Sequence, residues 1–212
     1  MARKAGTIGK EENKEMEFWT QEEFQAFLEC VADKPISYYA FEMLYWTGIR
    51  EGELLALTPA DFNFEKKTLR INKSYQRLEG KDVITDPKTP KSNRTIVMPD
   101  FLAVEMEDFI SSLYGIKDDD RIFTISKSYL HHEMDRGAKL AGVKRIRIHG
   151  LRHSHISLLI NLGFSALAIG ERVGHEAVDI TYHYAHLFPT VQTDMAAQLE
   201  TEREALVNVR KE

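Results

Sequence analysis

Side chains suited to phosphate chemistry recur in three separate segments of this 212-residue chain. In the first, T-G-I-R-E-G-E-L at 47–54, Arg50 follows a glycine turn at the start of a predicted helix, and Glu53 lies three residues further on. The planar, permanently charged guanidinium can bind two phosphate oxygens, and the N-terminus of a helix adds partial positive charge. The same spacing would also suit an ordinary surface ion pair between Arg50 and Glu53.

The second segment, H-G-L-R-H-S-H at 149–155, places histidines beside an arginine. On a helix, His149 shares a face with Arg152 or His153, so an imidazole and a guanidinium could act on one phosphate. His149, His153 and His155 could also suggest a metal site. The segment contains no glutamate or cysteine partner, and Arg152 would repel a cation, so we expect neither a metal nor a cofactor.

The third segment, 172–186, supplies His175 and two tyrosines, Tyr182 and Tyr184. Tyrosines in an amphipathic helix usually belong to the core or its rim, and taken alone these two would be read in that way. The order of the three segments is more informative than any one of them.

Short helices are predicted around the first segment. Thr20-Gln-Glu-Glu23 is a capping box that opens a helix with Phe24, Phe27, Leu28 and Val31 on one face. A second helix should run from Ser37 to Trp46 and end at Gly48, and a third should run from Arg50 to Leu57 before Thr58-Pro59.

Residues 62–98 read as short β-rich runs separated by turns, and the helical period returns from Asp100. The expected fold is therefore mainly α with one small antiparallel β-sheet (α+β), arranged as a meander. Residues 1–17 read as a linker or arm, 18–189 as one domain, and 190–212 as a helical tail. The apolar stripe of that tail consists of Val191, Met195, Leu199, Leu206 and Val209.

Composition limits the class of protein. No apolar stretch approaches the roughly 20 residues of a membrane span, the N-terminus lacks the apolar region of a secretory signal, and Cys30 is the only cysteine. We therefore expect a cytoplasmic protein. The net charge of −5 hides two segments, 66–94 and 136–153, that each carry +6, whereas residues 11–65 hold 13 acidic and 3 basic side chains. The basic segments could surround DNA or could be ordinary solvated faces.

Read in order, T-G-I-R-E-G-E-L, H-G-L-R-H, the G-H at 174–175 and a tyrosine nine residues later resemble the tyrosine recombinase (phage integrase) family. The resemblance extends from about Phe18 to Pro189, and the amino-acid sequences of the last two segments are most similar to those of integrases from Gram-positive conjugative transposons. It implies the catalytic-domain fold of that family. Such integrases carry arm-binding and core-binding domains before the catalytic one, and we expect both to be absent here.

The resemblance also assigns roles. Arg50 and Arg152 would hold the scissile phosphate, His149 and His175 would assist, and Tyr184 would attack. The stretch 88–99 resembles the family's K-T-x-x-S-x-R-x-I-x-P hairpin, which makes Lys88 the catalytic lysine. Lys91 and Lys73 are the alternative candidates for the catalytic lysine, and Tyr182 is the alternative candidate for the nucleophile.

A family member of this kind would cleave and rejoin double-stranded DNA through a 3′-phosphotyrosyl link, with no ATP. The implied partners are DNA, three further copies in a tetramer joined by exchange of the C-terminal tail, and accessory excision or host DNA-bending proteins. The tail could instead fold back on its own domain, and the acidic 11–65 block would face away from DNA. The competing interpretations are a type IB topoisomerase-like enzyme, a non-catalytic DNA-binding regulator and a metallohydrolase.

Overall fold

Helix α1 (Gln21–Val31) begins at the predicted capping box. In the computed structural model, which describes residues 17–86, 92–175, 177–184, 187, 196, 199–201 and 203, the Thr20 N–H donates to Glu23 Oε2 at 2.9 Å. The Glu23 N–H donates to Thr20 Oγ1 at 3.2 Å. The four apolar residues expected on one face are all buried, which confirms both the cap and the orientation of the helix.

The next two helices carry the first predicted segment. Helix α2 (Pro35–Thr47) ends at Gly48, whose φ of +65° is the left-handed conformation that glycine adopts without strain. Helix α3 (Glu51–Leu54) is shorter than the predicted Arg50–Leu57. The amides of Ala56 and Leu57 donate only three residues back, so the chain tightens and leaves the α-helix before the one-turn 3₁₀ helix η1 (Pro59–Asp61).

The β-region forms two antiparallel sheets, so the single meander was wrong. In sheet order, the first consists of β1 (Phe62–Asn63), β2 (Thr68–Ile71) and β5 (Arg94–Val97), and the second of β3 (Ser74–Leu78) and β4 (Lys81–Thr85). Strand β5 returns to pair with β2, with Thr68 opposite Val97. The β3–β4 hairpin therefore lies in the chain between β2 and β5, which pair with each other.

The turn of that hairpin explains its register. Leu78 pairs with Lys81, which leaves a two-residue loop of Glu79 and Gly80. Both have positive φ, 49° and 79°. Two left-handed residues in succession make the type I′ turn, whose twist matches that of the flanking strands.

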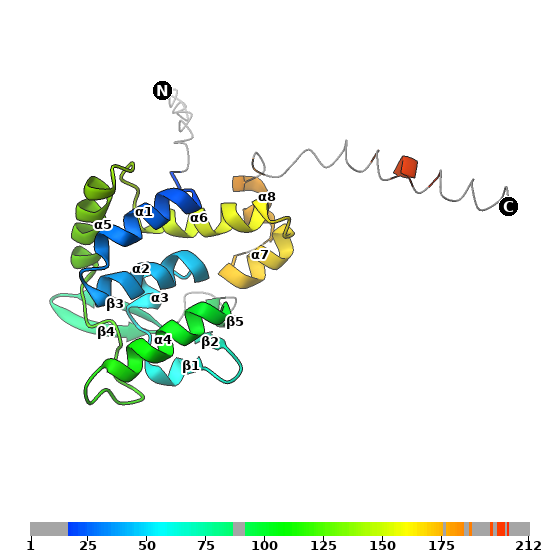
Figure 1. Ribbon diagram of the computed structural model, residues 1–212. Helices are drawn as coiled ribbons and strands as arrows, with labels where there is room; N and C mark the ends of the chain where they lie inside the picture. The colour runs from blue at the N-terminus through cyan, green and yellow to red at the C-terminus, as the bar shows by residue number, and fades with distance from the viewer. Residues whose placement is uncertain are drawn as a thin grey trace, which may run out of the picture.

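The remaining helices are α4 (Asp100–Ser112), α5 (Lys127–Ala141), α6 (Ile148–Asn161), α7 (Ala166–Val173) and α8 (Ala177–Tyr184). Figure 1 shows α6 lying across one side of α2, the strands and α4 lying on the other side, and α7 and α8 next to one end of α6. Helix α1 packs against α5, and α2 against α6. The mainly helical fold with a small antiparallel β component confirms the expected fold class.

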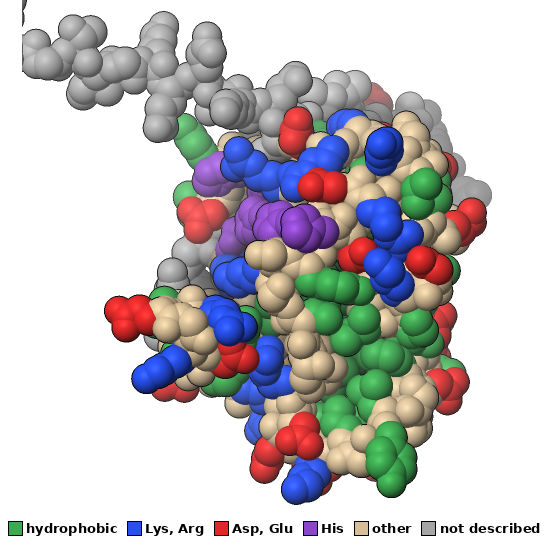
Figure 2. Space-filling model, turned by 90° about the vertical axis from the view of Figure 1, so that its left-hand side faces the viewer, with side chains coloured by type: hydrophobic (Ala, Val, Ile, Leu, Met, Phe, Trp, Pro, Cys, Tyr) green, Lys and Arg blue, Asp and Glu red, His purple; other side chains and the backbone are tan. Residues whose placement is uncertain are grey.

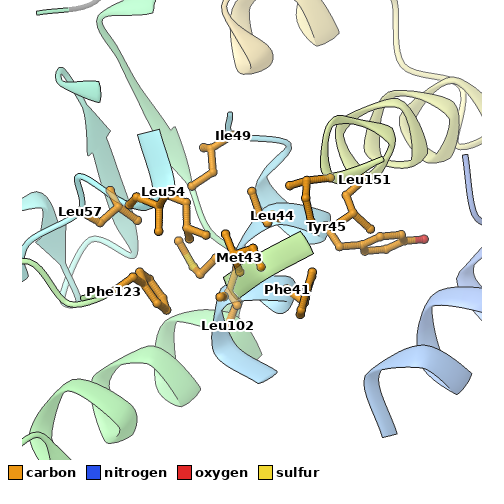
Figure 3. Packing of buried hydrophobic residues seen from close by; sticks show 14 of the residues in the cluster. Phe41, Met43, Leu44, Tyr45, Ile49, Leu54, Leu57, Leu102, Phe123 and Leu151 are labelled. Atoms are coloured by element: carbon orange, nitrogen blue, oxygen red, sulfur yellow. The ribbon is translucent and has the colours of Figure 1, made fainter. Parts of the chain in front are cut away.

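Two apolar clusters hold these elements together. The larger surrounds α2, where side chains from α2, α3, α4 and α6 converge around Met43 and Leu44 (Figure 3). The smaller lies among α6, α7 and α8 and includes Ile156, Ile180 and Tyr184. Because α8 belongs only to the smaller cluster, its attachment depends on few apolar side chains.

Three sequence predictions concern residues at the chain ends. Packing begins near Phe18 as expected, since Trp19 is buried and its indole N–H donates to the Lys144 carbonyl at 2.7 Å. The predicted arm lies almost wholly outside the described residues. So does the apolar stripe of the tail, except for Leu199, which is exposed. Within the described part of the chain, no helix is both long and apolar enough to cross a membrane.

Candidate active site

A cavity of about 490 Å³ lies where α3, strand β3 and the first turns of α5 and α6 meet. Arg50, Lys73, Lys127 and His149 line it together with Glu51 and Glu53. One arginine and two lysines outnumber the two carboxylates, and this excess of basic side chains favours an anion. On the face of the molecule shown in Figure 2, histidine side chains likewise form a group with Lys and Arg side chains around it.

Arg50 enters the cavity from the N-terminus of α3. Its backbone N–H donates to Glu53 Oε2 at 2.9 Å, and its Nη1 donates to Glu53 Oε1 at 2.8 Å. Its Nη2 lies 3.4 Å from the Gly174 carbonyl oxygen. The ion pair with Glu53 therefore exists, but Glu53 is only 5% exposed, so this is not an ordinary surface pair.

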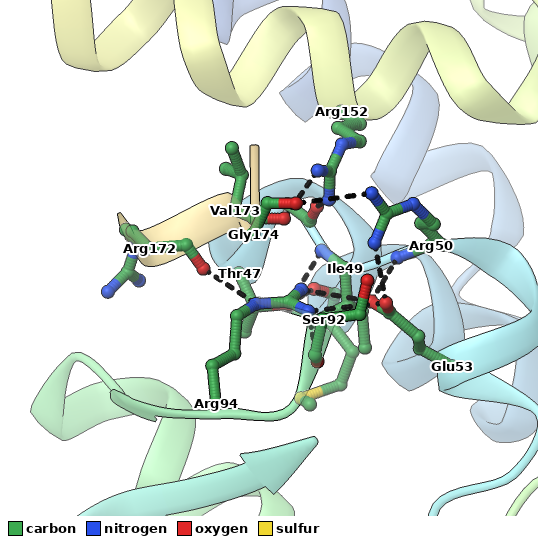
Figure 4. A network of polar contacts seen from close by, with 12 residues as sticks. Thr47, Ile49, Arg50, Glu53, Ser92, Arg94, Arg152, Arg172, Val173 and Gly174 are labelled. Carbon is green, nitrogen blue, oxygen red and sulfur yellow. Dashed lines mark hydrogen bonds and ion pairs between the residues drawn. The ribbon is translucent and has the colours of Figure 1, made fainter. Parts of the chain in front are cut away.

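Glu53 is held by a second arginine that the sequence reasoning gave no role. Arg94 donates through Nη2 and Nη1 to the two carboxylate oxygens of Glu53, at 2.9 and 3.2 Å, and through Nε to the Arg172 carbonyl at 2.9 Å (Figure 4). Burial alone would raise the pKa of Glu53, but hydrogen bonds and charge from Arg94 and Arg50 hold it below its ordinary value. The arginine of the S-x-R motif at 92–94 was the available signal.

Arg152 is 1% exposed, and it and Arg50 donate to the neighbouring carbonyls of Val173 and Gly174. Its Nη1 donates to the Gly48 carbonyl at 2.6 Å and its Nη2 to the Val173 carbonyl, so it ties the C-terminal ends of α2 and α7 together (Figure 4). Its Nε is buried without a hydrogen-bond partner among the described residues. Burial and the charge of Arg50 lower the pKa of Arg152 to about 9, which leaves it charged at neutral pH with donors to spare.

The two predicted histidines lie close to these arginines. His149 is exposed on the cavity wall, and partial desolvation with the charges of Arg152 and Arg50 lowers its pKa. His175 follows Gly174, which ends α7 with a φ of +71°. Burial and the same two charges lower the pKa of His175 to about 4. Both imidazoles are therefore neutral at pH 7 and can accept a proton.

Tyr184 and Tyr182 leave α8 in different directions. Tyr182 is 81% exposed, whereas Tyr184 is 2% exposed and belongs to the smaller apolar cluster. A hydrogen bond joins Tyr184 Oη to Nδ1 of His153 on α6. Burial raises the pKa of the Tyr184 phenol above its ordinary value. The hydroxyl is therefore held by His153, a contact that sequence reasoning did not anticipate.

The predicted catalytic lysine, Lys88, lies outside the described residues, and so does its competitor Lys91. The other competitor, Lys73, lines the cavity. Its Nζ donates to Asp61 Oδ2 at 2.5 Å and to Thr58 Oγ1 at 3.1 Å.

The expectation that the acidic 11–65 block faces away from the site was wrong for three of its members. Glu51 and Glu53 line the cavity, and Asp61 pairs with Lys73, which lines it too. The carboxylates of Glu53 and Asp61 are buried, and each holds a cation of the cavity in place. The charge count could not reveal this, because it treats inward-facing and outward-facing carboxylates alike.

The third histidine of the second segment has a separate position. His155 is 2% exposed, and its Nε2 accepts from Arg172 Nε at 3.0 Å. Its ring lies against Gly48, where a Cβ would approach it to 2.5 Å. His155 thus fills space between α2 and α7. In the described part of the chain, no three His, Cys, Asp or Glu side chains are grouped as metal ligands.

Comparison with known proteins supports the fold and supplies a family. The ICEBs1 integrase of Bacillus subtilis (strain 168) is 32% identical over 202 residues, which are 88% of this chain and 55% of that protein. A structure of the Tn1549 transposon integrase in complex with a circular intermediate DNA matches with a TM-score of 0.73 and 22% identity, covering 92% of this chain and 68% of that one. The catalytic domain of bacteriophage HP1 integrase matches with a TM-score of 0.61 and 20% identity, covering 87% and 95%.

The two structural matches have low sequence identity and therefore establish the fold alone. The chain spans about half the length of the curated relative, which leaves the activity of the whole protein to be proposed below. The profile of the phage integrase family matches residues 17–190, a range that includes all three predicted segments and every residue that lines the cavity. The chain therefore belongs to the phage integrase family.

Proposed function

We propose that this chain is the catalytic domain of a site-specific DNA recombinase that integrates and excises a mobile element through a 3′-phosphotyrosyl intermediate. The main observation behind this proposal is that Arg50 and His149, almost 100 residues apart, line one cavity, and that the buried charge of Arg152 acts on His149. Membership of the phage integrase family supports the same reaction. Binding alone would need neither a nucleophile nor neutral histidines at a phosphate site.

Charge is the main barrier in this reaction. Attack on a phosphodiester adds negative charge to oxygens that are already anionic, and fixed donors in a partly desolvated site stabilise that charge. In the proposed mechanism Arg50 provides a half-buried guanidinium in the cavity, and Arg152 provides a second, fully buried positive charge. Glu53 and Arg94 hold Arg50 in one orientation, so little reorganisation accompanies the reaction.

Two proton transfers accompany the change of bonds. Tyr184 Oη forms a bond to phosphorus and gives its proton to His149, with His175 assisting. The bond from phosphorus to the 5′ oxygen then breaks, and a lysine donates the proton that makes a free 5′-hydroxyl. The family motif favours Lys88 as this acid, whereas position in the cavity favours Lys73. A second DNA end reverses the step, so bond energy is conserved.

The proposal is tested with a nicked suicide substrate made from the end of the element. The wild-type chain should form a slower-migrating, protease-sensitive adduct on a denaturing gel, and Tyr184→Phe should not. Tyr182→Phe is the matched control, because it removes a neighbouring hydroxyl that is exposed to solvent. Loss of the adduct in Tyr182→Phe alone would reassign the nucleophile. No adduct from a chain extended to the length of its relatives would favour a non-catalytic DNA-binding protein.

The general acid is assigned by changing the leaving group. A substrate with sulfur in place of the bridging 5′ oxygen has a leaving group that needs no proton. Lys88→Ala and Lys73→Ala are each compared on the two substrates. The variant that fails on the oxygen substrate but recovers on the sulfur substrate lacks the acid. Recovery by neither variant would transfer the role to another residue.

The proposed partners are double-stranded DNA, further copies of the chain and accessory DNA-bending or excision proteins. The solved relative in complex with transposon-derived DNA supports the first of these. We also propose that the tail from 190 onward docks on a neighbouring copy and links four protomers on DNA. Removal of the chain after Pro189 should then abolish assembly on DNA, measured by native gel shift and light scattering. Unchanged assembly and cleavage would remove this part of the proposal.

A further inference from the structure

Tyr184 does not occupy the cavity where the proposed chemistry takes place. Among the described residues, the cavity is lined by side chains from α3, β3, α5 and α6, and Tyr184 is not one of them. Its ring is instead buried with Ile156 and Ile180, and its hydroxyl is bonded to His153. The proposed nucleophile is therefore held outside the cavity in which it would have to reach a phosphate.

The geometry of α6 provides a short path back to the cavity. His149 and His153 are four residues apart on this helix, so they lie one turn apart on the same face. Their ring centroids are 4.8 Å from each other. His149 lines the cavity, whereas His153 holds the tyrosine. A movement of α8 by roughly one helical turn, about 5 Å, would transfer the hydroxyl from one imidazole to the other.

The protonation states suit a holding contact. Burial, with repulsion from His149 when that ring is protonated and from Arg152, lowers the pKa of His153 to about 4, so its ring is neutral at pH 7. The Tyr184 phenol remains protonated. A protonated phenol can donate to an unprotonated Nδ1, so the pair is satisfied without placing a charge in the apolar cluster.

Helix α8 packs on α7, and its attachment to the smaller apolar cluster includes the residue that carries the hydrogen bond. The helix has eight residues, and two of its apolar side chains, Val178 and Tyr182, face solvent at 76% and 81% exposure. Ile180 and Tyr184 carry its attachment to α6 and α7. By contrast, His155 is tied to Arg172 and cannot exchange partners in this way.

We propose that His153 is a positioning residue that retains the Tyr184 hydroxyl at the interface of α6 and α8, and that cleavage begins when Tyr184 moves from His153 to His149. The inference deepens the proposed function and rests on Tyr184 as the nucleophile. His153 itself takes no part in the bond changes. Its effect is to keep the nucleophile away from phosphate until α8 shifts.

A matched pair of variants separates the hydrogen bond from the space that the ring fills. His153→Asn keeps a polar group near the position of Nδ1, and His153→Leu has a similar size but cannot bond. The 212-residue chain is labelled with 3-fluorotyrosine, and Tyr184→Phe identifies the fluorine resonance of Tyr184. We expect the resonance to shift toward that of exposed Tyr182 in His153→Leu and to stay near the wild-type value in His153→Asn.

Single-turnover cleavage of the suicide substrate supplies the second measurement. Loss of one hydrogen bond that favours the retained state should raise the cleavage rate of His153→Leu about fivefold, and His153→Asn should cleave at about the wild-type rate. If His153→Leu does not fold, His153→Gln replaces it, because its longer side chain moves the amide away from the Nδ1 position.

Three results would overturn the proposal. An unshifted resonance in His153→Leu would mean that apolar packing alone retains Tyr184. A fall of about 100-fold in cleavage by both variants would make His153 the proton acceptor, since asparagine cannot take that proton. A fall in His153→Leu that His153→Asn rescues would mean that the bond aids cleavage. If Tyr184→Phe still cleaves, the assigned nucleophile is wrong, whereas the resonance shift independently reports whether His153 holds the ring.

Discussion

At the scale of single residues, the site depends on buried charges that neutralise one another. Glu53 and Arg94 are each 6% exposed in their side chains and meet through two hydrogen bonds. Arg50 shares the same carboxylate. Removing one member of such a group leaves another charge buried without compensation, which costs more than the pair itself contributes. The cluster therefore couples the stability of the fold to the orientation of Arg50.

Replacing Arg94 should reveal this coupling. Arg94→Met keeps much of the side-chain volume but leaves Glu53 with Arg50 alone, and we expect the free energy of unfolding to fall by about 3 kcal/mol. The double variant Arg94→Met with Glu53→Gln should lose less than the sum of the two single variants, because no carboxylate remains unpaired. Urea unfolding measures all three. A loss below about 1 kcal/mol for Arg94→Met would mean that water readily compensates Glu53.

Motifs predicted that Arg50 and His149 belong to one site, but not what surrounds them. Both line the cavity, and their roles there remain predictions drawn from the resemblance to the family. The hydrogen bond between His153 and Tyr184 depends on how α6 packs on α8, and no local spacing specifies that packing. The contact of Arg94 with Glu53 was not predicted either, because the two residues are 41 positions apart in the chain.

At the scale of elements, close helix contacts fix the frame that carries these residues. Helices α1 and α5 meet at Gly137, where a Cβ would lie 2.5 Å from the Phe27 ring and 2.7 Å from Val31. Helix boundaries with capping signals, such as the start of α1, could be predicted because the cap is local. The length of α3 and the pairing of β5 with β2 could not, because both depend on contacts across the fold.

The substitution Gly137→Ala tests the contact between α1 and α5. Alanine favours a helix by about 1 kcal/mol over glycine, but overpacking of a filled core costs about 1–3 kcal/mol. Phe27 is fully buried and has no room to retreat, so we expect a net loss of about 1 kcal/mol in urea unfolding. Adding Val31→Ala should make Gly137→Ala less harmful than it is alone. Stabilisation by Gly137→Ala would show that α5 can move away from α1.

The interface of α2 with α4 contains the buried carboxyl of Glu42, whose pKa is raised by its surroundings, whereas the pKa values of the site histidines are lowered. Burial, together with the charge of Glu105, raises the pKa of Glu42 to about 8. Its folded pKa lies above the unfolded one, so its contribution to stability is complete below about pH 4.5 and is lost as pH rises toward 8. Stability from this group should fall by on the order of 2–3 kcal/mol between pH 5 and pH 7.

Glu42→Gln removes this pH response, since an amide does not titrate. Relative to wild type, the variant should become more stable by about 2–3 kcal/mol as pH rises from 5 to 7, measured by urea unfolding at the two pH values. Glu107→Gln on the exposed side of α4 is the control and should not change the difference between them. Equal effects of Glu42→Gln at pH 5 and pH 7 would mean that Glu42 is ionised in the folded protein.

At the scale of the whole molecule, a net charge of −5 coexists with a cationic cavity. Figure 2 shows acidic side chains among the basic ones on the face that it presents, so no uniform positive surface surrounds the site. Binding of DNA would then depend on a small number of phosphate contacts near the cavity. Such binding releases condensed counterions, and its affinity falls as salt rises.

We therefore expect this chain to bind a duplex weakly, with an affinity that decreases steeply between about 50 and 200 mM KCl. Lys127 lines the cavity at the start of α5, and Lys127→Ala should lower the slope of log affinity against log salt by about 1. Lys139, 12 residues along the same helix and about 18 Å away by helical rise, provides the matched control. Fluorescence anisotropy across a salt series measures both slopes. An equal decrease of the slope in the two variants would indicate that the whole protein attracts DNA diffusely. Tight sequence-specific binding at physiological salt would contradict the idea that the cavity is the principal contact with DNA.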